Sequence, residues 1–124
     1  MKTKFFYFFT LSQLIFYTSC SQKTSCDKLS INFKTYDKAA VEIKSADFKI
    51  EESVNTSESS WINSASYYSC DGETGYFILV ANGKEYIHSG VPYLVWGKFK
   101  TAKSFGSFYN KYLKHKYTLL LNKK

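Results

Sequence analysis

The chain has 124 residues, the size of one domain, and 19% of them are aromatic. One proline and six glycines are too few for a collagen-like or a low-complexity chain. The formal net charge is +7 and every cationic side chain is a lysine, which excludes bidentate arginine contacts to phosphate or to guanine.

The chain begins with the pattern of an export signal. Two lysines precede a mostly apolar run, Phe5–Ser19, and Cys20 follows it directly. A basic start before a short apolar stretch is typical of a secretory signal peptide. The run is shorter than the roughly 20 apolar residues that span a bilayer. We therefore expect residues 1–19 to form a signal helix that is removed on export.

The residues around Cys20 resemble a bacterial lipobox, in which the cysteine is acylated with fatty acids such as palmitate and becomes the new N-terminus. Tyr17 stands where that pattern prefers leucine, and Ser21 follows the cysteine instead of aspartate. The resemblance implies a lipoprotein with its lipid on Cys20, anchored to a membrane and facing the periplasm or the cell surface. Ordinary cleavage near Ser19 and an uncleaved apolar anchor are the alternatives.

Two further cysteines, Cys26 and Cys70, form an even pair in a chain that is expected to be exported. Cysteines in an oxidising compartment favour a disulfide. A bridge between them would close a loop of about 45 residues, which contributes roughly 3–4 kcal/mol in the chain-entropy picture. The alternative is that both are small apolar residues without a bond.

The segment after Cys20 is polar and has two predicted elements. Apolar residues recur close to helical spacing within Phe33–Ile43, which predicts a short helix. Apolar and polar residues then alternate from Phe48 to Val54, which predicts a short strand. The composition of Asn55–Ser60 is that of a loop.

Three strands are predicted next. Trp61–Tyr68 reads as the first, and Tyr76–Ala81 is apolar on both faces, as in a central strand that is covered on both sides. Asn82-Gly83 favours a type I′ hairpin turn. Lys84–His88 is therefore the expected hairpin partner.

Two helices complete the pattern. Val91-Pro92 is predicted to open the first, with Pro92 as its first helical residue, because the N–H that proline lacks is unpaired there. Ser104 is a suitable cap for the second helix, in which aromatic residues recur from Phe105 to Tyr112.

The predicted fold class is α+β, with a three-stranded antiparallel meander packed in two layers against two C-terminal helices. A short helix/strand extension and the signal helix precede it. We divide the chain into a signal peptide at residues 1–19, a lipidated N-terminus and extension at residues 20–58, and a folded domain at residues 59–124.

The order of these elements and their landmarks resembles the KTSC domain family, across residues 59–117. The second position of the family's central Tyr-x-Tyr is His88 in this chain, and Tyr86 matches the first. RNA binding has been suggested for the family, whose function is not established, so the resemblance implies a small binding module. The matching residues are Ser59, Ser60, Ile62, Tyr68, Tyr76–Val80, Asn82, Gly83, Tyr86, Val91, Pro92, Ser104, Gly106 and Asn110.

Glycine inside a helix costs about 1 kcal/mol relative to alanine, so Gly106 is expected to allow a close approach between helix and sheet. From Lys84 onward the chain has nine lysines and one acidic residue, Glu85. Such a basic surface attracts anionic partners. The alternative is a set of solvated helix faces.

No catalytic or metal-binding set is apparent in the sequence. The two histidines, His88 and His115, show no metal-ligand spacing, and no nucleophile elbow, P-loop or dinucleotide motif is present. We expect no enzyme activity, no metal and no cofactor. Aromatic residues expected near the surface are Tyr67, Tyr68, Tyr86, Tyr93 and Trp96, and the expected binding residues are Tyr86, His88, Trp96, Lys111 and Lys114.

His88 has two readings, a polar face of a binding groove or a hydrogen-bonded histidine at a strand end. The sequence as a whole predicts an exported, lipid-anchored, non-catalytic binding module. Its expected partners are the membrane, through the lipid, and either an envelope protein or an anionic envelope component. An RNA-binding module and an envelope hydrolase are the alternatives, and export disfavours nucleic acid because an exported protein does not meet tRNA.

Overall fold

The computed structural model describes residues 23–30 and 32–122. The predicted signal peptide, its helix and Cys20 lie outside the described residues. No helix in the described part of the chain is long and apolar enough to cross a membrane. In chain order the elements are β1 (Thr24–Ser25), η1 (Cys26–Lys28), α1 (Tyr36–Ser45), β2 (Ala46–Asp47), β3 (Ile50–Val54), β4 (Ile62–Ser69), β5 (Thr74–Ala81), β6 (Lys84–Pro92), α2 (Tyr93–Lys100), α3 (Phe105–Phe108) and η2 (Tyr109–Leu113).

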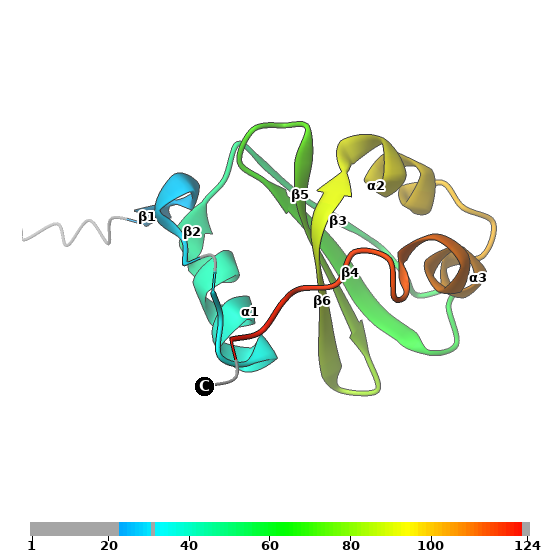
Figure 1. Cartoon of the computed structure of the whole chain (residues 1–124). Helices are drawn as coiled ribbons and strands as arrows, with labels where there is room; N and C mark the ends of the chain where they lie inside the picture. The colour runs from blue at the N-terminus through cyan, green and yellow to red at the C-terminus, as the bar shows by residue number, and fades with distance from the viewer. Residues whose placement is uncertain (1–22, 31, 123–124) are drawn as a thin grey trace, which may run out of the picture.

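The main sheet has four antiparallel strands in the order β3-β4-β5-β6 (Figure 1). The predicted meander of three strands is therefore one strand short. The short strand predicted in the extension forms as β3, and Val54 lies opposite Ala65 of β4. Alternating polarity predicted this strand, but alternation does not specify the neighbour with which a strand pairs.

Helices cover both faces of the sheet, so the predicted two-layer arrangement is wrong. Figure 1 shows α1 on one side and α2 with α3 on the other. The strand β5 explains the difference, because Phe77 and Leu79 face the cluster under α2 whereas Ile78 faces the cluster under α1. The expectation of a central strand covered on both sides is confirmed.

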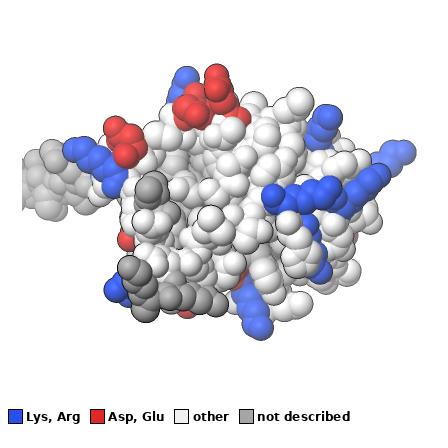
Figure 2. All heavy atoms as spheres, viewed as in Figure 1, with Lys and Arg blue, Asp and Glu red and all other residues white. Residues whose placement is uncertain are grey.

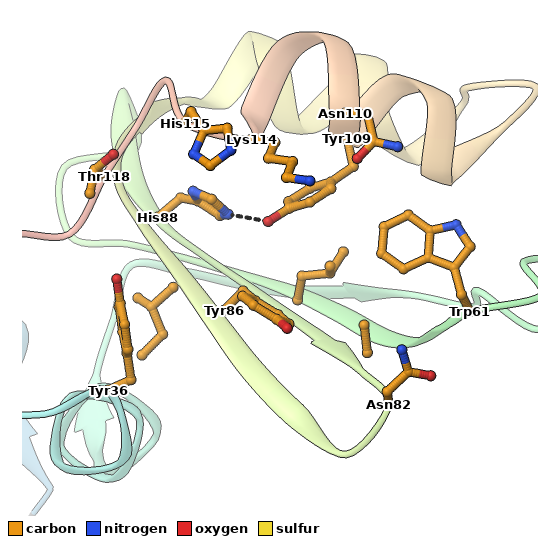
Figure 3. Close-up of a pocket in the computed structure, with 13 residues that line it drawn as sticks. Tyr36, Trp61, Asn82, Tyr86, His88, Tyr109, Asn110, Lys114, His115 and Thr118 are labelled. Carbon is orange, nitrogen blue, oxygen red and sulfur yellow. Dashed lines mark hydrogen bonds between the residues drawn. The ribbon is translucent and has the colours of Figure 1, made fainter.

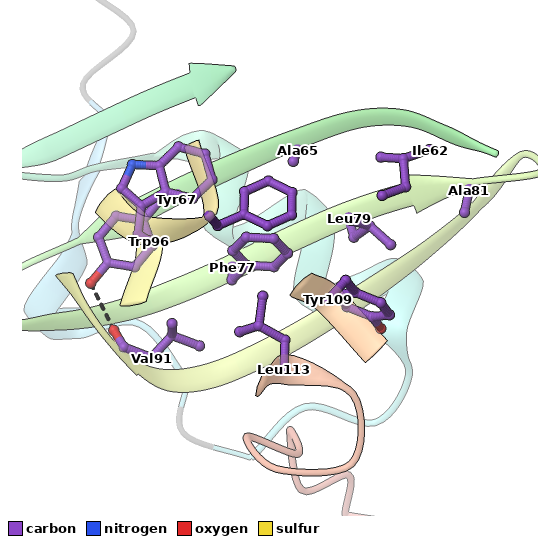
Figure 4. Packing of buried hydrophobic residues seen from close by; sticks show 11 residues of the cluster. Ile62, Ala65, Tyr67, Phe77, Leu79, Ala81, Val91, Trp96, Tyr109 and Leu113 are labelled. Carbon is purple, nitrogen blue, oxygen red and sulfur yellow. Dashed lines mark hydrogen bonds between the residues drawn. The ribbon is translucent and has the colours of Figure 1, made fainter. Parts of the chain in front are cut away.

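The face under α2 has a core built largely from aromatic rings (Figure 4). The rings of Tyr67 and Trp96 stack with their centroids 5.5 Å apart, and Phe77 meets Phe99 edge-on at 4.9 Å. The buried hydroxyl of Tyr67 donates a 2.7 Å hydrogen bond to the carbonyl of Val91. Desolvation raises the pKa of Tyr67 to about 12, so this donor stays protonated.

Trp96 and Tyr67 were both expected near the surface, and both are fully buried. Helix α2 begins at Tyr93, because Pro92 ends β6 and forms the N-cap with φ −61° and ψ 142°. The helix therefore presents Trp96 and Phe99 to the sheet. Tyr93 is partly exposed, as expected.

The N-terminal segment is fastened to the sheet by a disulfide between Cys26 and Cys70, whose Cα atoms are 5.8 Å apart. This confirms the predicted pairing. The two-residue strands β1 and β2 pair in parallel beside it. The predicted helix forms as α1, which begins after Thr35, whose hydroxyl oxygen accepts a hydrogen bond from the backbone N–H of Lys38.

The second predicted C-terminal helix forms as α3, continued by the π-helix η2. Ser104 is its cap and accepts a 3.2 Å hydrogen bond from the N–H of Ser107. The chain then returns along β6, where Thr118 pairs with His88. The segment after η2 therefore lies beside β6, next to the site described below.

Candidate functional site

A pocket of about 300 Å³ lies between the β5–β6 hairpin and the helical segment α3–η2 (Figure 3). Its volume is at the small end of the range usual for small-molecule sites. Its lining combines aromatic rings, amides, hydroxyls and one ammonium group. The residues that line it are Tyr36, Trp61, Leu79, Ala81, Asn82, Tyr86, Ile87, His88, Tyr109, Asn110, Lys114, His115 and Thr118.

Strand β6 brings Tyr86 and His88 to the pocket together. Alternate residues of a strand share a face, so both side chains point away from Ile87, which belongs to the cluster under α1. Tyr86 is 43% exposed and His88 is 7% exposed. The tyrosine therefore forms part of the rim, and the histidine lies at the base.

The hydrogen bonds of His88 define its tautomer. Its Nδ1 lies 3.2 Å from the carbonyl oxygen of Tyr117, and its Nε2 lies 2.9 Å from the hydroxyl of Tyr109. A carbonyl only accepts hydrogen bonds, so Nδ1 carries the proton and Nε2 of the neutral ring accepts from Tyr109. Both ring nitrogens thus have a partner, as in the reading of His88 as a hydrogen-bonded histidine.

Burial keeps this histidine–tyrosine pair neutral. Desolvation lowers the pKa of His88 below 6.5, and it raises the pKa of Tyr109 to about 12. The Tyr117 carbonyl opposes the shift of His88 and nearby His115 adds to it. At neutral pH the pair forms an uncharged, hydrogen-bonded floor to the pocket.

Trp61 forms another part of the rim. Its half-buried ring meets Tyr109 edge-on with the centroids 5.9 Å apart. Gly106 of α3 lies against the same indole, because a Cβ at this position would be 2.5 Å from Nε1 of Trp61. Gly106 was expected to allow a close approach between helix and sheet, whereas the close approach in the structure is to the indole side chain of Trp61, which precedes β4.

The pocket is positively charged. Lys114 is the one lysine of the lining, and the lining contains no aspartate or glutamate among the described residues. Asn110 also lines the pocket, and its amide makes no hydrogen bond to another described residue. Within the described ranges, no group of three histidine, cysteine or carboxylate side chains could hold a metal ion.

The wider surface around α2 and α3 is also basic. Figure 2 shows lysine side chains gathered on the right, over these two helices. Lys98, Lys103 and Lys111 are among its exposed residues. Lys111 lies outside the pocket, with its Nζ 5.1 Å from the centroid of the Tyr112 ring.

Three of the five expected binding residues, Tyr86, His88 and Lys114, therefore line one pocket. Trp96 belongs to the core and Lys111 points elsewhere, so neither lines it. Sequence reasoning did not assign Trp61 to the site. It also missed Asn110, although that residue lies four positions before Lys114, a spacing that places two side chains on one helix face.

One of the comparisons with known proteins gives a match. Residues 58–117 match the family model described as KTSC domain, as the resemblance in the sequence predicted. The matched range includes β4, β5, β6, both C-terminal helices and most of the pocket lining. No curated protein and no solved structure gives a significant match to the chain.

Proposed function

Since residues 58–117 of this chain form a KTSC domain, we propose that this domain is a non-catalytic binding module. The pocket beside Tyr86 and Lys114 binds an anionic component of the bacterial envelope. The chain is exported and is held at the membrane by a lipid on Cys20. Neither the nucleic-acid reading nor the hydrolase reading is favoured by a specific feature of the site.

The pocket itself is the single observation that supports a binding role. It joins exposed aromatic rings to a single ammonium group, with no carboxylate in the described lining to compete for it. Concave sites with apolar walls and a few polar groups are the usual form of ligand pockets. A positive site of this kind attracts anions and repels cations.

The chemistry of the pocket supports binding over catalysis. A general acid or base needs a proton that can move near neutral pH. His88 has both ring nitrogens engaged, and the pKa of Tyr109 is raised to about 12 by burial. With no carboxylate in the described lining, the base of the pocket lacks a pair that could exchange protons with a substrate.

Two features support export. The leader has the basic start, the apolar run and the cysteine of a lipoprotein signal. The disulfide between Cys26 and Cys70 belongs to an oxidising compartment, because cytosolic thiols are kept reduced.

Binding is tested by sedimenting the full chain with isolated envelope fractions at low and moderate salt. We expect Lys114→Met to reduce cosedimentation and Lys111→Met to leave it nearly unchanged. Lys111 is a matched control because it is an exposed lysine of the same helical segment outside the pocket. Equal losses in the two variants would contradict the pocket and indicate a diffuse basic surface.

Enzyme treatment of the fractions identifies the partner class. The proposal predicts that binding survives protease and ribonuclease. Loss after protease would indicate an envelope protein, and loss after ribonuclease would restore the RNA-binding alternative.

The anchor is tested separately by labelling cells with a radioactive fatty acid. We expect label on the wild-type chain, and none on Cys20→Ser. Cys26→Ser/Cys70→Ser is the matched control and should keep the label. A wild-type chain without label would refute lipidation at Cys20.

A further inference from the structure

The pocket lining reaches across the sheet, from the residue before β4 to β6. Trp61 precedes β4 and Tyr86 lies on β6, and β5 runs between these strands. In register, Tyr86 lies opposite Leu79, and Leu79 lies opposite Ala65 of β4. Trp61 is four residues before Ala65, so two strand spacings of about 4.8 Å and four rises of about 3.3 Å separate the backbones that carry the two rings by about 16 Å. Leu79 and Ala81 of β5 line the pocket between these two strands.

The ring faces around this space suit a flat, partly apolar ligand. Tyr86 is 43% exposed and Trp61 is half-buried, so both keep ring surface within reach of a ligand (Figure 3). Aromatic rings stack on other rings and on apolar C–H faces. A pyranose sugar has such C–H faces and polar edges.

Polar side chains lie at both ends of the pocket and on its helical side. Asn82 lies in the β5–β6 turn, Thr118 lies opposite His88, and Asn110 belongs to η2, and all three line the pocket and are exposed. A ligand with several hydroxyl groups satisfies amides and hydroxyls of this kind at its edges. This favours a sugar over a purely apolar ring.

The charge of the pocket selects among sugars. Lys114 brings one ammonium group to the lining, and none of its described neighbours there is acidic. An ammonium binds a carboxylate through a charge-assisted hydrogen bond. A nucleic-acid strand would need a row of cations along its backbone, whereas this lining provides a single lysine.

We propose that the pocket binds an acidic sugar ring, such as a uronic-acid unit of an anionic envelope polysaccharide. The ring packs on the exposed face of Tyr86, and its carboxylate pairs with Lys114. This inference rests on the proposed function of the same pocket and adds the chemical class of its ligand.

The test is calorimetric titration of the full chain, in detergent, with a galacturonate oligomer and with its methyl ester. The ester keeps every ring and removes the charge. We expect the acid to bind about tenfold more tightly than the ester, and Lys114→Met to bring the two to the same affinity. Lys111→Met should keep the tenfold preference.

Stacking is tested with two tyrosines of equal exposure. Tyr86 and Tyr112 are each 43% exposed, but Tyr112 lies outside the pocket and packs on Phe108. We expect Tyr86→Ala to weaken both ligands about tenfold and Tyr112→Ala to have little effect. Circular dichroism of each variant confirms that it is folded.

Each contrary result has a distinct meaning. Equal affinity for the acid and the ester would overturn the proposal that the ligand is acidic. Tighter binding of uridine 5′-monophosphate than of the acid would overturn the proposal that the ligand is a saccharide. Binding of neither sugar, combined with Lys114-dependent sedimentation on envelope fractions, would overturn this inference and leave the proposed function in place. Loss of that sedimentation difference as well would overturn both.

Discussion

The contact between Gly106 and Trp61 gives a sharp prediction, because two opposed effects act at one helix position. Replacing Gly106 with alanine adds a Cβ that would lie 2.5 Å from Nε1 and 3.0 Å from Cε2 of the indole. Either the indole must move or the helix must shift. Trp61 is part of the pocket rim, so the same change perturbs the site.

The magnitude follows from comparing these effects. Alanine is favoured over glycine inside a helix by up to about 1 kcal/mol. Adding a methyl group to a fully packed contact costs about 1–3 kcal/mol. The contact is with a ring on a half-buried side chain, and we therefore expect a net loss of about 1 kcal/mol in the free energy of unfolding of Gly106→Ala.

Gly97 is the matched control, since it lies in helix α2 and a Cβ there would meet no atom within 4 Å. Gly97→Ala is expected to gain up to about 1 kcal/mol, because only the helix propensity changes. Urea denaturation followed by far-ultraviolet circular dichroism measures both variants. At this domain size, 1 kcal/mol corresponds to about 4–8 °C in Tm.

A second substitution isolates the cause. In a Trp61→Phe background the smaller ring leaves room for the added methyl group, so Gly106→Ala should cost less there than in the wild type. Such coupling is expected for residues in direct contact. Equal stabilisation by Gly106→Ala and Gly97→Ala would refute the reasoning, as would the absence of coupling to Trp61.

Two other predictions concern stability. Burial lowers the pKa of His88 below 6.5, so as the pH falls through 6.5 the unfolded chain binds a proton that the folded chain does not. The contribution of His88 to the free energy of unfolding is therefore complete above pH 6.5 and is lost as the pH falls below this value. Urea titrations between about pH 7.5 and 5.5 should show this slope, and His88→Gln should flatten it; an unchanged slope in His88→Gln would assign the titration to another group. Removing the disulfide as Cys26→Ala/Cys70→Ala should lower the free energy of unfolding by about 3–4 kcal/mol. A reducing agent should have no further effect on the stability of this variant. A variant as stable as the oxidised wild type would show that the disulfide does not stabilise the fold.

Local chemistry explains which elements could be predicted from the sequence. Asn82 and Gly83 were expected in a type I′ turn, and both have positive φ, 52° and 74°. The cap at Ser104 was expected and acts over three residues, within the reach of a sequence pattern. Strand β5 was recognised as buried on both faces because its apolar run is continuous.

The errors concern contacts between distant segments. Strand β3 and helix α1 complete the sheet and cover its second face, and neither role is encoded in their own short patterns. Trp96 was expected near the surface because the chain has many aromatic residues, but Val95 and Trp96 lie four and three positions before Phe99 and both pack against the cluster under α2, with Trp96 fully buried. The pocket gathers residues from both ends of the domain, so its complete lining could not be read from a linear motif.

The bridge between Cys26 and Cys70 also determines how the molecule carries mechanical load. Tension applied upstream of Lys23 passes through two sulfur atoms into the end of β4, an interior strand of the sheet. The cysteines are 44 positions apart, so the segment between them, about 150 Å long when fully stretched, cannot extend while the disulfide is intact. Reduction would turn a stiff attachment into a long compliant one, which single-molecule pulling would record as a longer contour length.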